Sequence, residues 1–221
     1  MKLIYKDVGH IIRFDEGYVN ELVVENKRLF FEMAENIAQQ IDGLHGKFVL
    51  SINDAPVEFS RYADETVQFA PFHLNRKSLL TKLYSSLERN ALQAENYMKT
   101  STMLSNLESY IQDLAEEFPF EIDCTKVTVS SVIRALSPEI TEDDKTTLEK
   151  IFTYMELVRL LDRDRLFIMV NMRTYFSDED MEMFVQSVCL HDFKVLLLES
   201  TSARLLENTK RYTIDDDLCE F

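Results

Sequence analysis

The chain has 221 residues, of which 46% are hydrophobic and 29% charged, and its formal net charge is −15. This composition is ordinary for a soluble globular protein, and no apolar run approaches the roughly 18 residues that a bilayer-spanning helix needs. The first residues, MKLIYKDVGHIIRFDE, turn acidic before a signal-peptide core develops. We therefore expect a cytoplasmic protein that neither crosses a membrane nor is exported.

The cysteines and the net charge restrict the function further. Cys124, Cys189 and Cys219 lie far apart without a C-x-x-C pair, which predicts reduced thiols rather than a disulfide or zinc framework. A net charge of −15 argues against nucleic acid, because phosphate binding needs Lys and Arg. That argument holds only if the charge is spread evenly, since a groove can be basic inside an acidic protein.

The first 72 residues alternate apolar runs with polar turns. KLIYK and HIIRF predict two strands around a turn at residues 7–9, and KFVLSI predicts another after the turn DGLHG. Between them, apolar residues at helical spacing predict a helix over residues 19–41. These residues are Leu22, Phe30, Met33, Ile37 and Ile41.

From His73 onward the pattern becomes helical. Residues 73–118 contain no Gly or Pro and repeat apolar residues every three or four positions, which predicts one long helix or two nearly continuous ones. Pro119 ends this region, VTVSSVIRAL forms a shorter helix, and Pro138 ends that. TEDD at residues 141–144 resembles an N-cap that opens a returning helix from Lys145 to about Leu161.

The last part of the chain predicts a strand, a helix and a strand. Residues 166–170 form a continuous apolar run, as expected of a strand covered on both faces. Ser177 to Asp180 caps the helix MEMFVQSVCL, and KVLLLES is a second continuous run. We therefore predict an α/β fold, with a head of residues 1–72 and 163–221 built on a parallel βαβ core. Residues 73–162 form an inserted helical leg.

A nucleotide-binding or catalytic site has little support in the sequence. A phosphate loop needs four residues between its glycines and then Lys and Ser/Thr, but only two residues separate Gly43 from Gly46, and Phe48 follows Lys47. A helix C-cap and a turn explain this segment better. No nucleophile motif accompanies the four histidines, and Asn171 and Arg173 after the buried run favour strand-end hydrogen bonding over catalysis. We predict that the protein is not an enzyme.

Carboxylates cluster where the long helical region ends, at Glu116, Glu117, Glu121 and Asp123. Glu121 and Asp123 are two apart in extended chain, so they point the same way and can share a hard cation such as calcium. The alternative is a solvated acidic surface, which is what such clusters usually are.

Basic residues concentrate on and near the helical region, at Arg76, Lys77, Lys82, Arg89, Lys99, Lys126, Arg134, Lys145 and Lys150. Lys82 and Arg89 are seven apart and share a helix face. A salt-bridged helix surface is the ordinary explanation. Few aromatic residues alternate with these cations, and no recognition-helix or zinc-finger pattern is present. The remaining nucleic-acid mode is sequence-neutral phosphate contact with a duplex.

The chain resembles a known family over roughly residues 70–200. The segments LNRKSLLTKLYSSLE, VTVSSVIRAL, TTLEKIFTYMELVRLLDRDRLFIMVNMRTYFSDEDMEMFVQSV and KVLLLES are similar in order and pattern to the short form of the CRISPR type II-A spacer-acquisition accessory protein. The resemblance implies a degenerate nucleotide-hydrolase head without a phosphate loop, carrying a helical leg. It also implies a homotetrameric ring that binds ends of double-stranded DNA in a lysine-lined hole, with calcium at acidic residues near the leg.

Carried over to this chain, the resemblance places the metal region at Glu121 and Asp123, with Glu117 as a further candidate. Thr125 and Lys126 stand where relatives usually carry more carboxylates, which puts calcium dependence in question. Arg134 matches a basic position of the family. We add Arg76, Lys77, Lys82 and Lys126 to the DNA-binding candidates on charge.

The partners that the resemblance implies are the CRISPR spacer integrase and the guide-directed effector nuclease. Two alternatives remain open at this point: a nucleotide-binding α/β enzyme, and a helical scaffold that binds other proteins.

Overall fold

The computed structural model describes residues 1–14, 17–123, 126–142 and 145–220. The chain divides into two compact units: the head, formed by Met1–Phe72 with Asp144–Phe221, and the helical unit, His73–Asp143. The first boundary lies where we expected it, but the predicted leg of residues 73–162 was too long. The returning helix packs in the head instead. No helix in the described part of the chain is long and apolar enough to cross a membrane.

A five-stranded sheet forms the centre of the head. Its order is β6 (Ala63–Thr66), β7 (Leu166–Val170), β8 (Lys194–Glu199), β3 (Val19–Val24) and β9 (Thr209–Ile214), and every neighbouring pair is parallel. The helix α7 (Asp178–Leu190) connects β7 to β8. The predicted α/β fold with a parallel βαβ core is confirmed, and all five residues of β7 are buried.

The strand β3 corrects the prediction of a helix over residues 19–41. All six residues of VNELVV are buried, and the strand lies between β8 and β9. Its burial on both faces removes the alternation that reveals a half-buried strand, so Leu22 matched the helical spacing by coincidence. The helix α1 begins only at Lys27 and ends at Ile41, and the side chain of Asn26 caps it by accepting a hydrogen bond from Leu29 N.

A second, antiparallel sheet of four strands packs in the head. Its order is β2 (Ile11–Arg13), β1 (Lys2–Tyr5), β4 (Phe48–Ile52) and β5 (Ala55–Pro56), and the short helix α2 (Phe59–Tyr62) follows. The strands predicted at KLIYK, HIIRF and KFVLSI are confirmed. Gly43, with φ of +84°, follows the end of α1, so the glycine segment is a helix end and a turn, as the sequence indicated.

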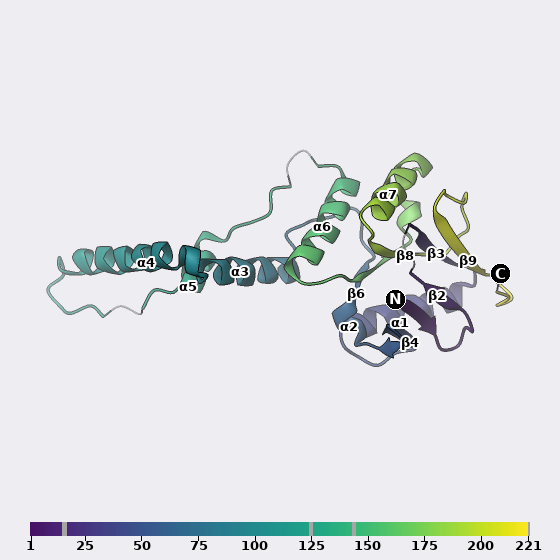
Figure 1. Cartoon of the computed structure of the whole chain (residues 1–221), viewed down its shortest axis with the longest axis horizontal. Coiled ribbons are helices and arrows are strands. Elements are labelled where there is room, and N and C mark those ends of the chain that lie inside the picture. Colours follow the sequence, from purple (N-terminus) through teal and green to yellow (C-terminus); the bar gives the residue numbers. More distant parts are fainter. Residues whose placement is uncertain (15–16, 124–125, 143–144, 221) are drawn as a thin grey trace. The chain divides into compact units, whose positions relative to one another are not determined.

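Helices and the antiparallel sheet cover the two faces of the parallel sheet (Figure 1). On one face, Leu166, Ile168 and Leu198 join a core with Leu3 and Met33 of the antiparallel sheet and α1. On the other face lie α7 and α6 (Thr147–Leu161), and the short helix η1 (Met172–Thr174) follows β7 in the chain. Both faces of the sheet are therefore protected from water, as an all-parallel sheet requires.

The sequence predicted the N-cap of α7 correctly but placed the N-cap of α6 at the wrong residues. Ser177 and Asp180 form a capping box at the start of α7, as predicted. At α6 the capping box is Thr146 with Glu149, five residues after Thr141 of the TEDD segment, so the helix begins later than predicted. Residues 143 and 144 of that segment lie outside the described residues.

The helical unit contains α3 (Lys77–Ala91), α4 (Ala94–Ala115) and α5 (Val129–Leu136). The predicted two nearly continuous helices are α3 and α4, separated at Leu92 and Gln93. Among the described residues of this unit, only Leu74, Leu79 and Val129 are buried.

Candidate functional site

Most of the predicted DNA-binding residues lie on or beside one pair of helices, α3 and α5, which contact each other. We call residues 76–91 and 126–136 the cationic pair. They carry six basic residues against one carboxylate, Glu88, in a chain whose net charge is −15. The basic residues are Arg76, Lys77, Lys82, Arg89, Lys126 and Arg134. The folding of the helical unit therefore brings together positive charges that the sequence distributes over residues 76–134.

Local chemistry fixes the ends of α5 and so the position of Arg134. Thr128 and Ser131 form a capping box at its start, and Ser137 adopts a left-handed conformation at its end, with φ of 44°. The Ser137 hydroxyl donates a hydrogen bond of 2.8 Å to the carbonyl oxygen of Arg134. Arg134 lies in the last turn of α5, where a cation interacts favourably with the helix dipole, and its side chain is exposed.

The other members of the cationic pair differ in exposure. Arg76 is the N-cap residue of α3, and it is half-buried, as is Lys82. Lys77 begins α3, Lys126 precedes α5, and both are exposed. Within the described part of the chain, Lys77, Lys126 and Arg134 form no ion pair. These three side chains are available to a polyanion without first breaking an internal contact.

The predicted metal ligands do not come together. Glu117, Glu121 and Asp123 follow the end of α4, and all three are exposed. Nowhere among residues 1–14, 17–123, 126–142 and 145–220 do three or more His, Cys, Asp or Glu side chains gather closely enough to hold a metal ion. The residues as placed do not form a calcium site, so calcium binding stays a prediction of the family resemblance.

The helix α4 presents apolar side chains to solvent. All 22 of its residues are described, and none is buried. Met103, Leu107, Ile111 and Leu114 repeat at three- and four-residue spacing, and they are 38–43% exposed. Met98 and Tyr110 lie beside them along the same helix and are more exposed still. We call these six residues the α4 apolar face. A contiguous exposed apolar surface of this kind marks an interaction site more often than a bare monomer surface.

The head contains a buried ionic cluster that sequence reasoning found only in part. Glu21 of β3 is fully buried and pairs with Arg173 Nη1 at 2.9 Å and with Arg211 Nε at 2.7 Å. Arg173 also pairs with Asp178 at 2.9 Å, at the start of α7. Arg173 therefore forms ion pairs at the end of β7, in line with the prediction of strand-end hydrogen bonding. Glu21 and Arg211 gave no signal, because they lie 152 and 38 residues from it.

Glu199, at the end of β8, completes this cluster. Its carboxylate accepts a hydrogen bond of 3.1 Å from the backbone N–H of Arg173. Burial raises the pKa of Glu199 to about 7, because the buried carboxylate loses its hydration. Nearby, the Asn171 side chain accepts a 2.9 Å hydrogen bond from Ser200 N and so joins the ends of β7 and β8. Ion pairs and backbone contacts thus occupy the carboxyl ends of these strands, where α/β proteins usually bind ligands.

The connection between β3 and α1 is also unlike a phosphate loop. It consists of Glu25 and Asn26 and contains no glycine. The side chain of Asn26 bonds Leu29 N at 3.0 Å, so the protein itself satisfies this N-terminal amide. Glu25 also places a carboxylate just before the N-terminus of α1, where a bound phosphate would need free backbone N–H donors.

Comparison with known proteins gives a consistent result. The model of a family described as "CRISPR-associated protein (Cas_Csn2)" matches residues 31–218. A CRISPR-associated protein Csn2 of Enterococcus faecalis is 25% identical over 150 residues, which are 66% of each chain. A Csn2 of Streptococcus agalactiae is 23% identical over 150 residues, covering 66% of this chain and 65% of the relative. The match thus spans just under two thirds of the length of these relatives.

The fold also has a solved counterpart. The crystal structure of Stu0660 of Streptococcus thermophilus superposes with a TM-score of 0.61 and 13% sequence identity. The superposition covers 96% of this chain and 74% of the other. At this level of identity the likeness concerns the fold alone.

Proposed function

Because the chain belongs to the Csn2 family of CRISPR-associated proteins and therefore has a CRISPR-associated role, we propose that it binds ends of double-stranded DNA during spacer acquisition. The binding is sequence-neutral and non-enzymatic, and a ring-shaped homotetramer performs it. The spacer integrase and the guide-directed effector nuclease are the proposed partners. The cationic pair carries the DNA part of this proposal.

The chemistry of the cationic pair suits phosphate contact. Lys77, Lys126 and Arg134 are exposed and lack an ion pair among the described residues. Their cationic groups can displace counterions from a duplex. Contacts of this type fix the position of a protein on DNA but carry no sequence information. The expected affinity therefore depends steeply on salt and hardly on base sequence.

The α4 apolar face supports self-association. An isolated helix gains little stability in water without tertiary packing, and α4 has no buried residue. A second copy of the same face would cover Leu107 and Ile111 and join two chains symmetrically, and a second interface between such pairs would close a ring of four. Ring closure would retain a duplex although each phosphate contact is weak, and a duplex without an end could not enter.

The absence of catalysis is likewise part of the proposal, and the head supports it. The ends of β7 and β8 are occupied by the Glu21–Arg173–Arg211 cluster and by Asn171. The β3–α1 connection provides no glycine-rich loop. Calcium at Glu117, Glu121 and Asp123 is not needed for any step proposed here, and a chelator tests it separately.

The test compares DNA topology. A gel-shift series with linear and covalently closed circular duplexes of one sequence, at two salt concentrations and with or without calcium, should show binding to the linear form only. Equal binding of both forms would exclude a closed ring. Failure to bind either would favour the helical protein-interaction scaffold, and measurable ATP or GTP binding would favour the nucleotide-binding enzyme.

Charge reversal tests the cationic pair. Arg134→Glu should weaken DNA binding by about tenfold and reduce the slope of log affinity against log salt by about one or more, because a phosphate contact is replaced by repulsion. The oligomer mass should not change. Arg28→Glu is the matched control, since Arg28 is an exposed cation of the head. Equal affinities of the two variants would show that Arg134 does not face DNA.

A further inference from the structure

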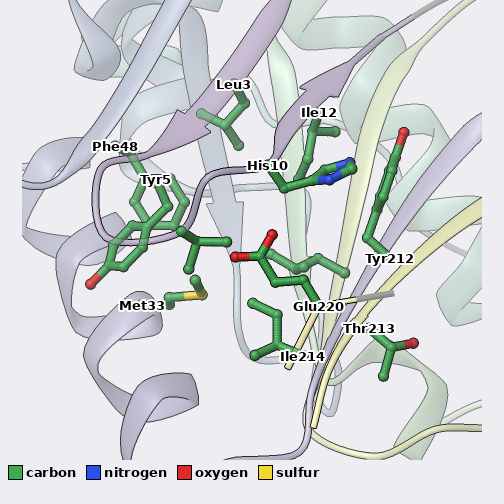
Figure 2. A pocket seen from close by; sticks show the side chains of 12 residues that line it. Leu3, Tyr5, His10, Ile12, Met33, Phe48, Tyr212, Thr213, Ile214 and Glu220 are labelled. Carbon is green, nitrogen blue, oxygen red and sulfur yellow. The ribbon is translucent and has the colours of Figure 1, made fainter. Parts of the chain in front are cut away.

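The head contains a cavity that the proposed DNA-binding function does not use. It has a volume of about 240 Å³ and lies between the antiparallel sheet and the β3–β9 side of the parallel sheet. Leu3, Ile12, Leu22 and Met33 line it, all 5% exposed or less. Figure 2 shows Leu3, Ile12 and Met33 converging from β1, β2 and α1. A cavity of about 150 Å³ holds one benzene ring, so this cavity has room for a ring with a short chain.

One carboxylate, that of the exposed residue Glu220, borders this apolar space. Figure 2 shows the carboxyl group of Glu220 among the lining side chains. Among the described residues that line the cavity, Glu220 is the only carboxylate, and none is Lys or Arg. Glu220 Oε1 accepts a 3.3 Å hydrogen bond from the backbone N–H of Gly9, which leaves most of its accepting capacity unused.

The chain end is folded so that Glu220 reaches the cavity. Ile214 and Glu220 form an antiparallel bridge. The carboxylate of Asp215 accepts hydrogen bonds from Asp217 N at 3.0 Å and from Cys219 N at 2.8 Å. These bonds close the turn that joins Ile214 to Glu220. A defined turn therefore holds the backbone of Glu220 beside the cavity.

Aromatic rings surround the same space. Tyr5 and Phe48 lie with their ring centroids 4.7 Å apart, and His10 lies 4.0 Å from Tyr212. All four residues line the cavity. The negative faces of phenol and phenyl rings attract cations, and they act in the same direction as a carboxylate.

We propose that this cavity binds a small organic cation, with an apolar body about the size of one ring and an ammonium group that pairs with Glu220. An apolar pocket with a single convergent charge is the usual form of a small-molecule site. The sign of that charge selects an ammonium group over a carboxylate. Every residue of the site belongs to the head, so the proposal does not depend on DNA binding by the helical unit.

The test uses three ligands that share one ring: phenethylammonium, 2-phenylethanol and 3-phenylpropionate. Each is titrated into the full-length protein labelled with ¹³C at its methionine methyl groups. Met33 lines the cavity and is fully buried, whereas Met183 is an exposed methionine of α7. The Met33 signal should shift saturably with phenethylammonium, with an affinity at least about fivefold higher than for the alcohol, as expected of one partly exposed ion pair. The carboxylate should bind most weakly.

Two variants locate the ligand. Glu220→Gln should bring phenethylammonium to within about twofold of the alcohol, whereas Glu207→Gln, an exposed carboxylate elsewhere in the head, should change nothing. Val8→Phe fills the cavity and should remove the saturable Met33 shift for all three ligands.

Equal affinity for the ammonium and the carboxylate would overturn the proposal, as would ligand shifts at Met183 without shifts at Met33. If Val8→Phe does not fold, the Glu220→Gln comparison decides alone.

Discussion

The two units of this protein treat their apolar residues in opposite ways. The head buries both faces of its parallel sheet, and β7, β3 and most of β8 are inaccessible to water. In the helical unit, the described residues include only three buried ones, and α4 exposes the side chains that in the head would form a core. The head therefore buries its core within one chain, whereas the helical unit leaves the α4 apolar face exposed to solvent.

Within the helical unit, two regions differ in charge. The cationic pair carries six basic residues and Glu88, while residues 94–123 carry Lys99 and seven carboxylates. The net charge of −15 therefore coexists with a local excess of positive charge in the cationic pair. This difference is the physical basis for assigning DNA contact to α3 and α5 and self-association to α4.

The largest expected effect concerns the buried ionic cluster of the head. Glu21→Gln should lower the free energy of unfolding by about 3–5 kcal/mol, because Arg173 and Arg211 would keep their charges without the central carboxylate. Urea denaturation measures this. The control is Glu182→Gln, whose partner Arg204 is 59% exposed, and it should cost less than about 1 kcal/mol. Similar losses in the two variants would mean that the cluster does not stabilise the head.

A pair of truncations compares the units directly. Leu197→Ala, at a fully buried position of β8, should cost about 2–5 kcal/mol of unfolding free energy. Ile111→Ala, on the α4 apolar face at 43% exposure, should cost less than about 1 kcal/mol at concentrations where the chain is monomeric. Denaturation at low protein concentration measures both. A large loss for Ile111→Ala in the monomer would show that α4 packs within one chain.

A smaller effect depends on pH. The pKa of Glu199 is raised to about 7 in the folded head, so the folded state holds its proton while the unfolded state releases it. The stabilisation is complete below about pH 4.5 and is lost as the pH rises through 7. Glu199→Gln should therefore be nearly neutral at pH 5 and stabilising by about 1–3 kcal/mol at pH 8. Thermal or urea unfolding at the two pH values checks this, and a pH-independent difference would contradict it.

Part of the fold was predictable because its signals are local. The continuous apolar runs of β7 and β8, and the Ser177–Asp180 capping box between them, identify the βαβ unit without reference to the rest of the chain. The strand β3 was missed because Asn20 and Glu21 interrupt its apolar run. A buried glutamate is acceptable there only because Arg173 and Arg211 approach it in the folded head.

The candidate sites also differ in how far the sequence could predict them. Arg134 and Lys126 were predicted from charge and resemblance, and the structure adds that α5 packs on α3 beside the other cations. The carboxylates Glu117, Glu121 and Asp123 are close in sequence, but the segment after α4 does not gather them. The cavity of the head could not be predicted, because Leu3 and Glu220 come from opposite ends of the chain.

The molar mass in solution, measured by light scattering, tests most directly the claim that the helical unit is completed by other copies of the chain. We expect about four times the 25.9 kDa of one chain. The double substitution Leu107→Asp with Ile111→Asp should reduce that mass, while Ser105→Asp, an exposed position on another side of α4, should leave it unchanged. A wild-type mass of one chain, or a tetramer that survives the double substitution, would contradict the account.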